Sequence, residues 1–157
     1  SWFSSILGRS CRLVYMPDST KRLVEKQEHS SEHITGFSDA YPFLIVSEQS
    51  LEDLNSRLPN AMSMKRFRPN LVVDANQAFE EDSWKTIKIG EVIFDLVKPC
   101  KRCVLTTVNP ETGEKGEEPL KTLSSYRKIN NEILFGQNAV QRNNGQIHVG
   151  DQIEILA

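Results

Sequence analysis

Two cysteines with basic neighbours are the residues of this chain whose types and spacing could do chemistry. Cys100 and Cys103 are separated by Lys101 and Arg102, and Lys98 precedes them. Cationic side chains favour a thiolate over a thiol, and the thiolate is the form that attacks electrophiles or binds a soft metal. An electrophile or a metal is therefore the leading candidate partner of this segment.

Spacing alone leaves several other functions of the cysteine pair open. A structural zinc site needs two more ligands, from Cys11 or from the distant His29 and His33, in an order unusual for compact zinc modules. A thioredoxin-like redox motif would open a helix, whereas Cys103 is followed by β-branched residues typical of a strand. A disulfide suits small secreted domains, and three cysteines without a signal peptide argue against it. Cys103 could also be an ordinary buried side chain, since free cysteine is often buried.

The segments that must position these thiols are mainly β. Alternating apolar side chains predict a hairpin over residues 86–97, with Gly90 near its turn. The β-branched run at residues 103–108 predicts a central strand, so the thiols would lie at a strand entrance. Pro110 and Gly113 then predict a turn. Shorter strands are expected at residues 12–15, 44–46, 71–73 and 152–155.

Two short helices are expected beside these strands. Ser50 begins a capping-box-like start of a helix that ends near Leu58, and Pro119 opens another that runs through Tyr126. Many short strands with turn signals and few helices predict a mainly β fold, a closed or nearly closed β-barrel with a few peripheral helices. The polar residues 18–38, which include both loop histidines, predict a mobile loop or lid.

Three motifs of this chain resemble the signature of MOSC domains. They are the run Cys-Val-Leu-Thr-Thr-Val-Asn-Pro-Glu-Thr-Gly at residues 103–113, Phe67-Arg68-Pro69-Asn70, and Phe135-Gly136-Gln137-Asn138. Further similarity lies at residues 38–48, 53–58 and 149–151, so nearly the whole chain is covered in order. The chain is most similar to the YcbX-like proteins of bacteria and to the mitochondrial amidoxime-reducing component. The resemblance also implies a β-barrel.

The resemblance assigns roles to particular residues. Members of the family bind a molybdenum cofactor that carries a pterin, and Cys103 occupies the position of the cysteine that ligates the metal and is catalytic. The positions of Arg68 and Asn70 hold the cofactor, and a loop approaches it at residues 39–41. That loop is Asp39, Ala40 and Tyr41 here, whereas close relatives have small hydroxyl residues at the last two positions. Arg102, next to the ligand cysteine, is counted among the cofactor-binding residues.

Elementary chemistry is compatible with these roles. A single soft thiolate leaves coordination positions of molybdenum open for oxo groups and substrate. Arg68 offers a planar fork of donors suited to phosphate, and Asn70 offers both a donor and an acceptor to a pterin edge. Pro69 predicts an extended backbone at Arg68. Without the resemblance, Arg68 would be an ordinary solvated member of the cluster at residues 65–68.

Composition restricts the remaining possibilities. The chain has 157 residues, of which 38% are hydrophobic and 25% charged, as in one soluble globular domain. A net charge of −2 argues against nucleic-acid binding, because the basic cluster at residues 65–68 is short and is offset by nearby acidic residues. No apolar run reaches the length of a membrane span or of a signal sequence, so no membrane association and a cytoplasmic location are expected.

These observations lead to one hypothesis with two alternatives. Residues 1–157 are expected to form a single MOSC domain, with the part up to about residue 40 as the tail of an N-terminal β-rich region. The resemblance implies a molybdenum-dependent oxidoreductase that reduces N-hydroxylated substrates, such as amidoximes or hydroxylated nucleobases. An external electron donor, an iron-sulfur, flavin or cytochrome protein, would supply electrons. The alternatives are a non-enzymatic cofactor or sulfur carrier and a structural β-barrel interaction module.

Overall fold

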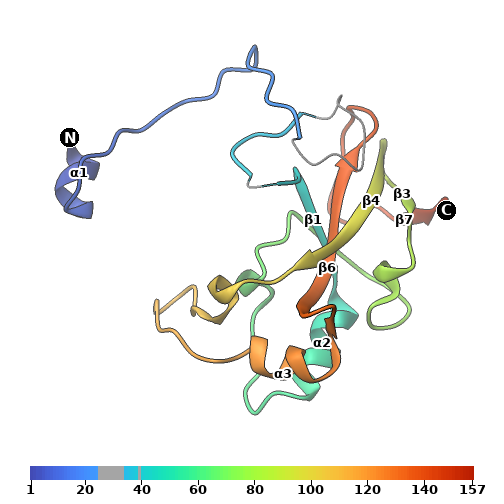
Figure 1. The fold of residues 1–157 in the computed structure, drawn as a ribbon. Helices are drawn as coiled ribbons and strands as arrows, with labels where there is room; N and C mark the ends of the chain where they lie inside the picture. Colours follow the sequence, from blue (N-terminus) through green and yellow to red (C-terminus); the bar gives the residue numbers. More distant parts are fainter. Residues whose placement is uncertain (25–33, 39) are drawn as a thin grey trace.

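The computed structural model describes residues 1–24, 34–38 and 40–157, and its centre is one curled sheet (Figure 1). Within these residues the sheet has seven strands in the order β2-β1-β6-β4-β3-β7, and β5 pairs with β6 outside this path. The strands are β1 (Phe43–Ser47), β2 (Leu71–Val73), β3 (Thr86–Ile89), β4 (Val92–Lys101), β5 (Lys128–Ile129), β6 (Glu132–Gln141) and β7 (Ile153–Ile155).

The two outermost strands of this sheet face each other across an open seam. β2 pairs with β1 in parallel, β7 pairs with β3 in antiparallel, and both β2 and β7 line the same pocket. The sheet is therefore a nearly closed barrel with one unsealed seam. This architecture confirms the fold class predicted from the sequence.

The hairpin of β3 and β4 lies where the alternating pattern predicted it. Gly90 has a φ of 53° at its turn, and a Cβ there would lie 2.5 Å from Asp151 Oδ2. Only glycine combines this left-handed backbone with so close an approach. The strands expected at residues 44–46, 71–73 and 152–155 are also present, as β1, β2 and β7.

Helices cover one end of the sheet. They are α2 (Glu48–Ser56) and α3 (Leu120–Tyr126), and α1 (Trp2–Leu7) lies apart from them near the N-terminus (Figure 1). Pro119 caps α3 as expected. α2 begins earlier than predicted, because Ser47 rather than Ser50 is its N-cap and accepts a hydrogen bond from the backbone of Ser50.

The two largest of three apolar clusters among the described residues fill the space between these elements. One lies against the β3–β4 hairpin and includes Trp84, Ile87 and Phe94. The other joins the sheet to α2 and α3, and in it the ring of Phe67 stacks on that of Phe135 at a centroid distance of 4.2 Å. Phe67 belongs to the segment before β2, so this stack fixes that segment against β6.

The N-terminal arm, residues 1–20, extends away from the sheet (Figure 1). The strand predicted at residues 12–15 is not formed, and Leu13, Val14 and Tyr15 are exposed. A strand needs a partner for its backbone groups, and no described strand lies beside this arm. No helix among the described residues has the length and apolarity needed to cross a membrane.

The predicted polar loop at residues 18–38 lies partly outside the described residues, as do His29 and His33. In its described parts, Leu23 and Ile34 form an isolated antiparallel bridge. Arg22 Nη1 donates to the carbonyls of Gly36 and Ser38, at 2.5 and 2.9 Å. These bonds join the two described ends of the loop to each other.

Candidate functional site

The two cysteines lie at the end of β4 and not at the entrance of a strand. Cys100 is the penultimate residue of β4, and Cys103 precedes the 3-10 helix η3 (Val104–Thr107), so the strand predicted at residues 103–108 is wrong. Thr106 and Thr107 explain the difference. Their hydroxyls donate to the carbonyls of Cys103 and Val104, at 3.0 and 2.8 Å, and such local bonds compete with a strand ladder.

The structure gives the two thiols different environments. Cys103 is exposed, and no hydrogen bond to its sulfur is made within the described part of the chain. Cys100 is half-buried, and its sulfur accepts a 3.1 Å hydrogen bond from Arg102 Nη1. Neither cysteine is in a disulfide. Cys103 is thus the thiol that a ligand could reach.

A zinc site receives no support from the described residues. They contain no group of three or more Cys, His, Asp or Glu side chains that could hold a metal ion. His29 and His33, the proposed partners of such a site, lie outside the described residues. A metal at Cys103 would therefore be bound, as far as the described residues go, through its single thiolate.

Arg102 ties the end of β4 to the segment that precedes β2. Its Nη2 donates to the carbonyl of Phe67 at 2.7 Å, and its guanidinium lies 5.3 Å from the centroid of the Phe67 ring. Its Nε is buried and has no partner among the described residues. A buried donor without an acceptor is costly in a native fold, and this one is adjacent in sequence to Cys103.

The same bridge brings the Arg68-Pro69-Asn70 segment beside the cysteine segment. η1 (Met64–Arg66) packs against η3, and Arg66 Nη1 lies 3.5 Å from the carbonyl of Thr106. Arg68 follows Phe67 directly and is exposed. Residues more than thirty positions apart in sequence therefore meet at one place on the surface.

The backbone of Arg68 is not extended as Pro69 predicted. Its φ is 54°, in the left-handed region that side chains other than glycine rarely adopt. The backbone N–H of Arg68 donates to the carbonyl of Lys65 at 3.3 Å, so a tight turn follows η1. A strained residue on an exposed surface is found more often at functional sites than elsewhere.

Asn70 is held by the first residues of β1. Its backbone N–H donates to the carbonyl of Leu44, and its Oδ1 accepts from the Leu44 N–H, both at 2.9 Å. Its Nδ2 has no hydrogen-bond partner within the described ranges and remains available as a donor. The side chain that was predicted to hold a cofactor therefore also fixes the turn between Arg68 and β2.

Two further predicted residues, Ala40 and Tyr41, belong to a different cluster. Tyr41 is buried, and its ring packs with Val24 and Val140 while Ala40 lies against the same cluster. The large aromatic ring of Tyr41 fills this part of the core, where a small hydroxyl side chain would leave space. Asp39 lies outside the described residues.

Comparison with known proteins identifies the family of this chain. Residues 32–154 match the MOSC domain family. The chain belongs to the MOSC domain family. Mitochondrial amidoxime-reducing component 1 of Mus musculus is 41% identical over 170 aligned positions, which cover 99% of this chain and 49% of that protein. The human protein of the same name is 46% identical over 76% of this chain and 38% of its own length.

A second kind of MOSC protein is also similar. The molybdenum cofactor sulfurase of Arabidopsis thaliana is 36% identical over 86% of this chain, but the match covers only 19% of that protein. The chain spans about half the length of the amidoxime-reducing components and less of the sulfurase. The MOSC domain is thus shared by relatives whose names describe different activities.

These relatives contradict the predicted cytoplasmic location. The mouse and human proteins, and a rat protein 38% identical to this chain, are named as mitochondrial. The prediction depended on the lack of an apolar run of the length of a membrane span or a signal sequence in these residues. Mitochondrial targeting segments are amphipathic and not long apolar runs, so this criterion could not decide the compartment.

The structure adds residues that the sequence did not single out. Phe67 supplies the carbonyl and the ring that Arg102 contacts, and Arg66 reaches η3. Asn138 Nδ2 lies 3.3 Å from the carbonyl of Lys98 in the irregular part of β4. Phe67 and Asn138 belong to the family motifs, and that membership was the signal that could have given them a role.

Proposed function

We propose that this chain is the MOSC part of an oxidoreductase that reduces N-hydroxylated small molecules, with the molybdenum cofactor held at Cys103. The observation that carries the proposal is the exposed thiol of Cys103, which makes no hydrogen bond in the described part of the chain and is adjacent in sequence to Arg102, whose buried Nε has no partner among the described residues. The names of the mouse, human and rat relatives support the substrate class, because an amidoxime is an N-hydroxylated compound.

The residues at this place fit such a cofactor. Cys103 would hold the metal, because molybdenum in a sulfur-rich shell prefers a soft thiolate. Arg68 and Arg102 would bind oxygen atoms of the pterin and its phosphate with their guanidinium groups, and Asn70 Nδ2 would donate to a ring edge. When bound, the cofactor would supply the acceptor for the substrate oxygen and the path for the electrons.

The protein's own contribution is to hold these donors in place. The carbonyl of Cys103 accepts from both the N–H and the hydroxyl of Thr106, at 3.2 and 3.0 Å, which fixes the backbone that carries the thiol. Arg102 and Asn70 fix the two ends of the turn that carries Arg68. Donors fixed before binding need not be reorganised when a charged ligand arrives.

The complete protein would need parts beyond the barrel. The family match begins at residue 32, and the exposed apolar side chains of the N-terminal arm have no cover among the described residues. These observations support the proposal that the part up to about residue 40 is the tail of an N-terminal β-rich region that helps hold the pterin and to which Asp39 belongs. An iron-sulfur, flavin or cytochrome protein would supply electrons, and the location would be mitochondrial.

A second candidate function is a carrier of the cofactor or of sulfur. The similarity to the molybdenum cofactor sulfurase of Arabidopsis favours it, since that name describes sulfur chemistry. The exposed Cys103 would then hold the metal or a persulfide transiently. The same residues would be used, but no substrate would be turned over.

The cofactor proposal is tested by measuring the molybdenum content and the oxidised-pterin fluorescence of the gently purified chain. Cys103→Ser should abolish both signals, and Cys100→Ser should leave most of them. Arg68→Lys should lower both, because an ammonium cannot reproduce the guanidinium fork. Equal losses from the two cysteine variants would indicate a paired thiol site and contradict the proposal.

Turnover separates the two candidate functions. The loaded protein is mixed with benzamidoxime and reduced methyl viologen, and the amidine product is measured over time. Steady formation of amidine that requires Cys103 supports the reductase. A chain that holds the cofactor and transfers it to an apo-enzyme without forming amidine supports the carrier.

A further inference from the structure

A second candidate site lies at the seam of the barrel. β2 and β7 line one cavity of about 950 Å³, and neither strand has a second partner among the described residues. Each strand therefore presents a row of backbone N–H and C=O groups to the seam. Unpaired edges of this kind are templates for pairing with another extended chain.

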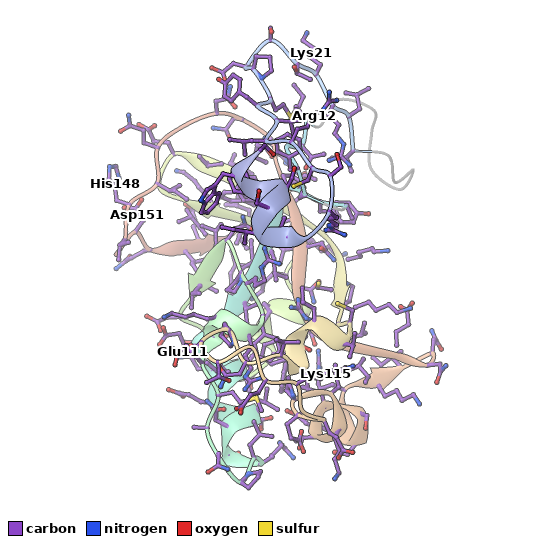
Figure 2. All side chains as sticks on the ribbon, turned by 90° about the vertical axis from the view of Figure 1, so that its left-hand side faces the viewer. Arg12, Lys21, Glu111, Lys115, His148 and Asp151 are labelled. Atoms are coloured by element: carbon purple, nitrogen blue, oxygen red, sulfur yellow. The ribbon has the colours of Figure 1, made fainter. Side chains whose placement is uncertain are left out.

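The lining of this cavity is acidic. Its described residues include the carboxylates of Glu48, Asp74, Glu80 and Asp151 but no Lys or Arg. His148 is the one other ionisable side chain of the lining; it lies beside Asp151 on the loop before β7, away from Glu111 and Lys115 of the segment after Cys103 (Figure 2). The cavity therefore favours a positively charged occupant.

The four carboxylates of the cavity differ in whether they already accept hydrogen bonds from the protein. The backbone N–H of Asn76 donates to Glu80 at 2.6 Å and lowers the pKa of that carboxyl, and Asp151 accepts from the backbone N–H of His148 at 2.7 Å. Glu48 and Asp74 are exposed and form no ion pair within the described part of the chain. These two carboxylates remain available to a cation.

The floor of the cavity is apolar and contains one unused donor. Ile89, Ile147 and Ile153 line it together with Trp84, which is only 6% exposed. The indole N–H of Trp84 is buried and has no hydrogen-bond partner among the described residues. A buried Trp N–H usually has an acceptor, so an unsatisfied donor lies directly beneath the apolar lining of the cavity.

We propose that this seam binds an extended polypeptide segment in which basic and apolar side chains alternate. The backbone of the segment pairs with the edges of β2 and β7 that have no partner among the described residues, and its apolar side chains pack over Trp84. Successive side chains of a strand point to opposite faces, so the apolar set packs on the floor while the basic set meets Glu48 and Asp74. A small organic cation would use the carboxylates but would leave both edges unpaired.

This site does not depend on the chemistry of Cys103. Among the predicted cofactor-binding residues that the structure describes, Asn70 is the one that also lines the cavity. The tests therefore leave Asn70 unchanged and can be carried out on protein without cofactor, so that their outcome is distinct from that of the cofactor experiment.

The first experiment titrates the chain with a fluorescent synthetic peptide of alternating lysine and valine, of about six residues, a common strand length. We expect saturable binding that weakens with salt, and no binding of the matched glutamate–valine peptide. A lysine–valine peptide with two prolines in place of central valines should also fail to bind, because proline cannot donate to a sheet. Equal binding of all three peptides would overturn the proposal.

A pair of matched double variants tests the location. Glu48→Gln with Asp74→Asn should weaken binding of the lysine–valine peptide about tenfold. Glu52→Gln with Glu117→Gln removes the same charge from exposed residues outside the cavity and should leave the affinity unchanged. An equal loss of affinity in the two double variants would show that only the net charge of the protein matters. That result would contradict a binding site at the seam.

Two further measurements test the mode of binding. Hydrogen exchange should slow at the amides of both β2 and β7 when the peptide binds, and Trp84 emission should shift in a Trp2→Phe background that leaves it as the one tryptophan. Benzamidine, a small organic cation, tests the alternative occupant of the cavity. If it binds in an Asp74-dependent manner while the peptide does not, the cavity takes small organic cations and the proposal is wrong.

Discussion

Two polar clusters of this barrel use their hydrogen-bonding groups in opposite ways. The carboxylate of Glu81, which is fully buried, accepts from the backbone of Ser47 at 3.2 Å and from the hydroxyls of Ser47 and Ser50 at 2.8 Å each. Arg102, next to Cys103 in sequence, has a buried Nε for which residues 1–24, 34–38 and 40–157 offer no partner, and nearby Arg68 has a strained backbone.

The difference indicates what each cluster is for. Both oxygens of the fully buried Glu81 carboxylate accept from protein donors, so the cluster anchors the N-terminus of α2 to η2 (Glu80–Asp82). The Arg102 cluster retains an unused donor and a strained turn, which a fold tolerates where a ligand satisfies them. Stability should therefore depend on the first cluster and binding on the second.

The largest expected effect comes from removing the buried carboxylate. Glu81→Ala deletes three hydrogen bonds to a charged acceptor and leaves donors of Ser47 and Ser50 unpaired, so it should lower the free energy of unfolding by about 3–4 kcal/mol. Urea denaturation measures this loss. Glu111→Ala, at an exposed turn residue, is the control and should change stability by less than about 0.5 kcal/mol.

A smaller loss is expected at the bridge between the two segments of the candidate site. Arg102→Ala removes the hydrogen bonds to Phe67 and Cys100 and the contact with the Phe67 ring, which should cost about 1–3 kcal/mol. Hydrogen exchange should also become faster in the turn at residues 67–70. A variant with unchanged stability and exchange would show that the bridge does not position Arg68.

Much of the barrel could be predicted because its pattern is local. The hairpin at β3 and β4 follows from alternating side chains on either side of Gly90, and α3 follows from Pro119 at its start. The strand predicted at residues 103–108 failed because Thr106 and Thr107 bond to nearby carbonyls instead of joining the sheet. Propensity cannot show which of these bonds a threonine will make.

The candidate site was predictable in its members but not in its geometry. The family motifs pointed to Cys103, Arg68 and Asn70, whose segments the structure brings together, although their roles stay predictions. The left-handed turn at Arg68 depends on Arg102 and on the stack of Phe67 with Phe135, which are distant in sequence. Packing decided that conformation against the preference of a residue before proline.

The strained turn itself supplies the next test of the comparison. Arg68→Gly relieves a left-handed backbone that costs a side chain roughly 1–2 kcal/mol, and the greater freedom of glycine in the unfolded chain offsets part of that gain. We expect a net stabilisation of about 0.5–1 kcal/mol together with a loss of molybdenum content. Arg68→Ala, which keeps the strain, should lose the metal without gaining stability. A destabilised glycine variant would show that the Arg68 side chain serves the fold.

The smallest effect on stability is expected at an ion pair whose groups are hydrogen-bonded to each other but are partly exposed to solvent. Arg57 donates from Nε and Nη2 to the carboxylate of Asp53 at 2.9 and 2.8 Å, and this hydrogen bonding holds the pKa of Asp53 below its usual value. A carboxyl whose pKa is lowered by folding contributes stability at neutral pH and loses it as the pH falls through its folded pKa. Asp53→Asn should therefore lower Tm at pH 7 by only about 1–2 °C, because exposed ion pairs are weak. The difference in Tm from the wild type should disappear at acidic pH, where the carboxyl group of Asp53 is protonated.

A difference in Tm that persists unchanged in acid would mean that Asp53 acts through packing. A decrease in stability as large as that of Glu81→Ala would contradict the comparison. It would show that a hydrogen-bonded carboxylate stabilises this fold equally well whether it is buried or exposed.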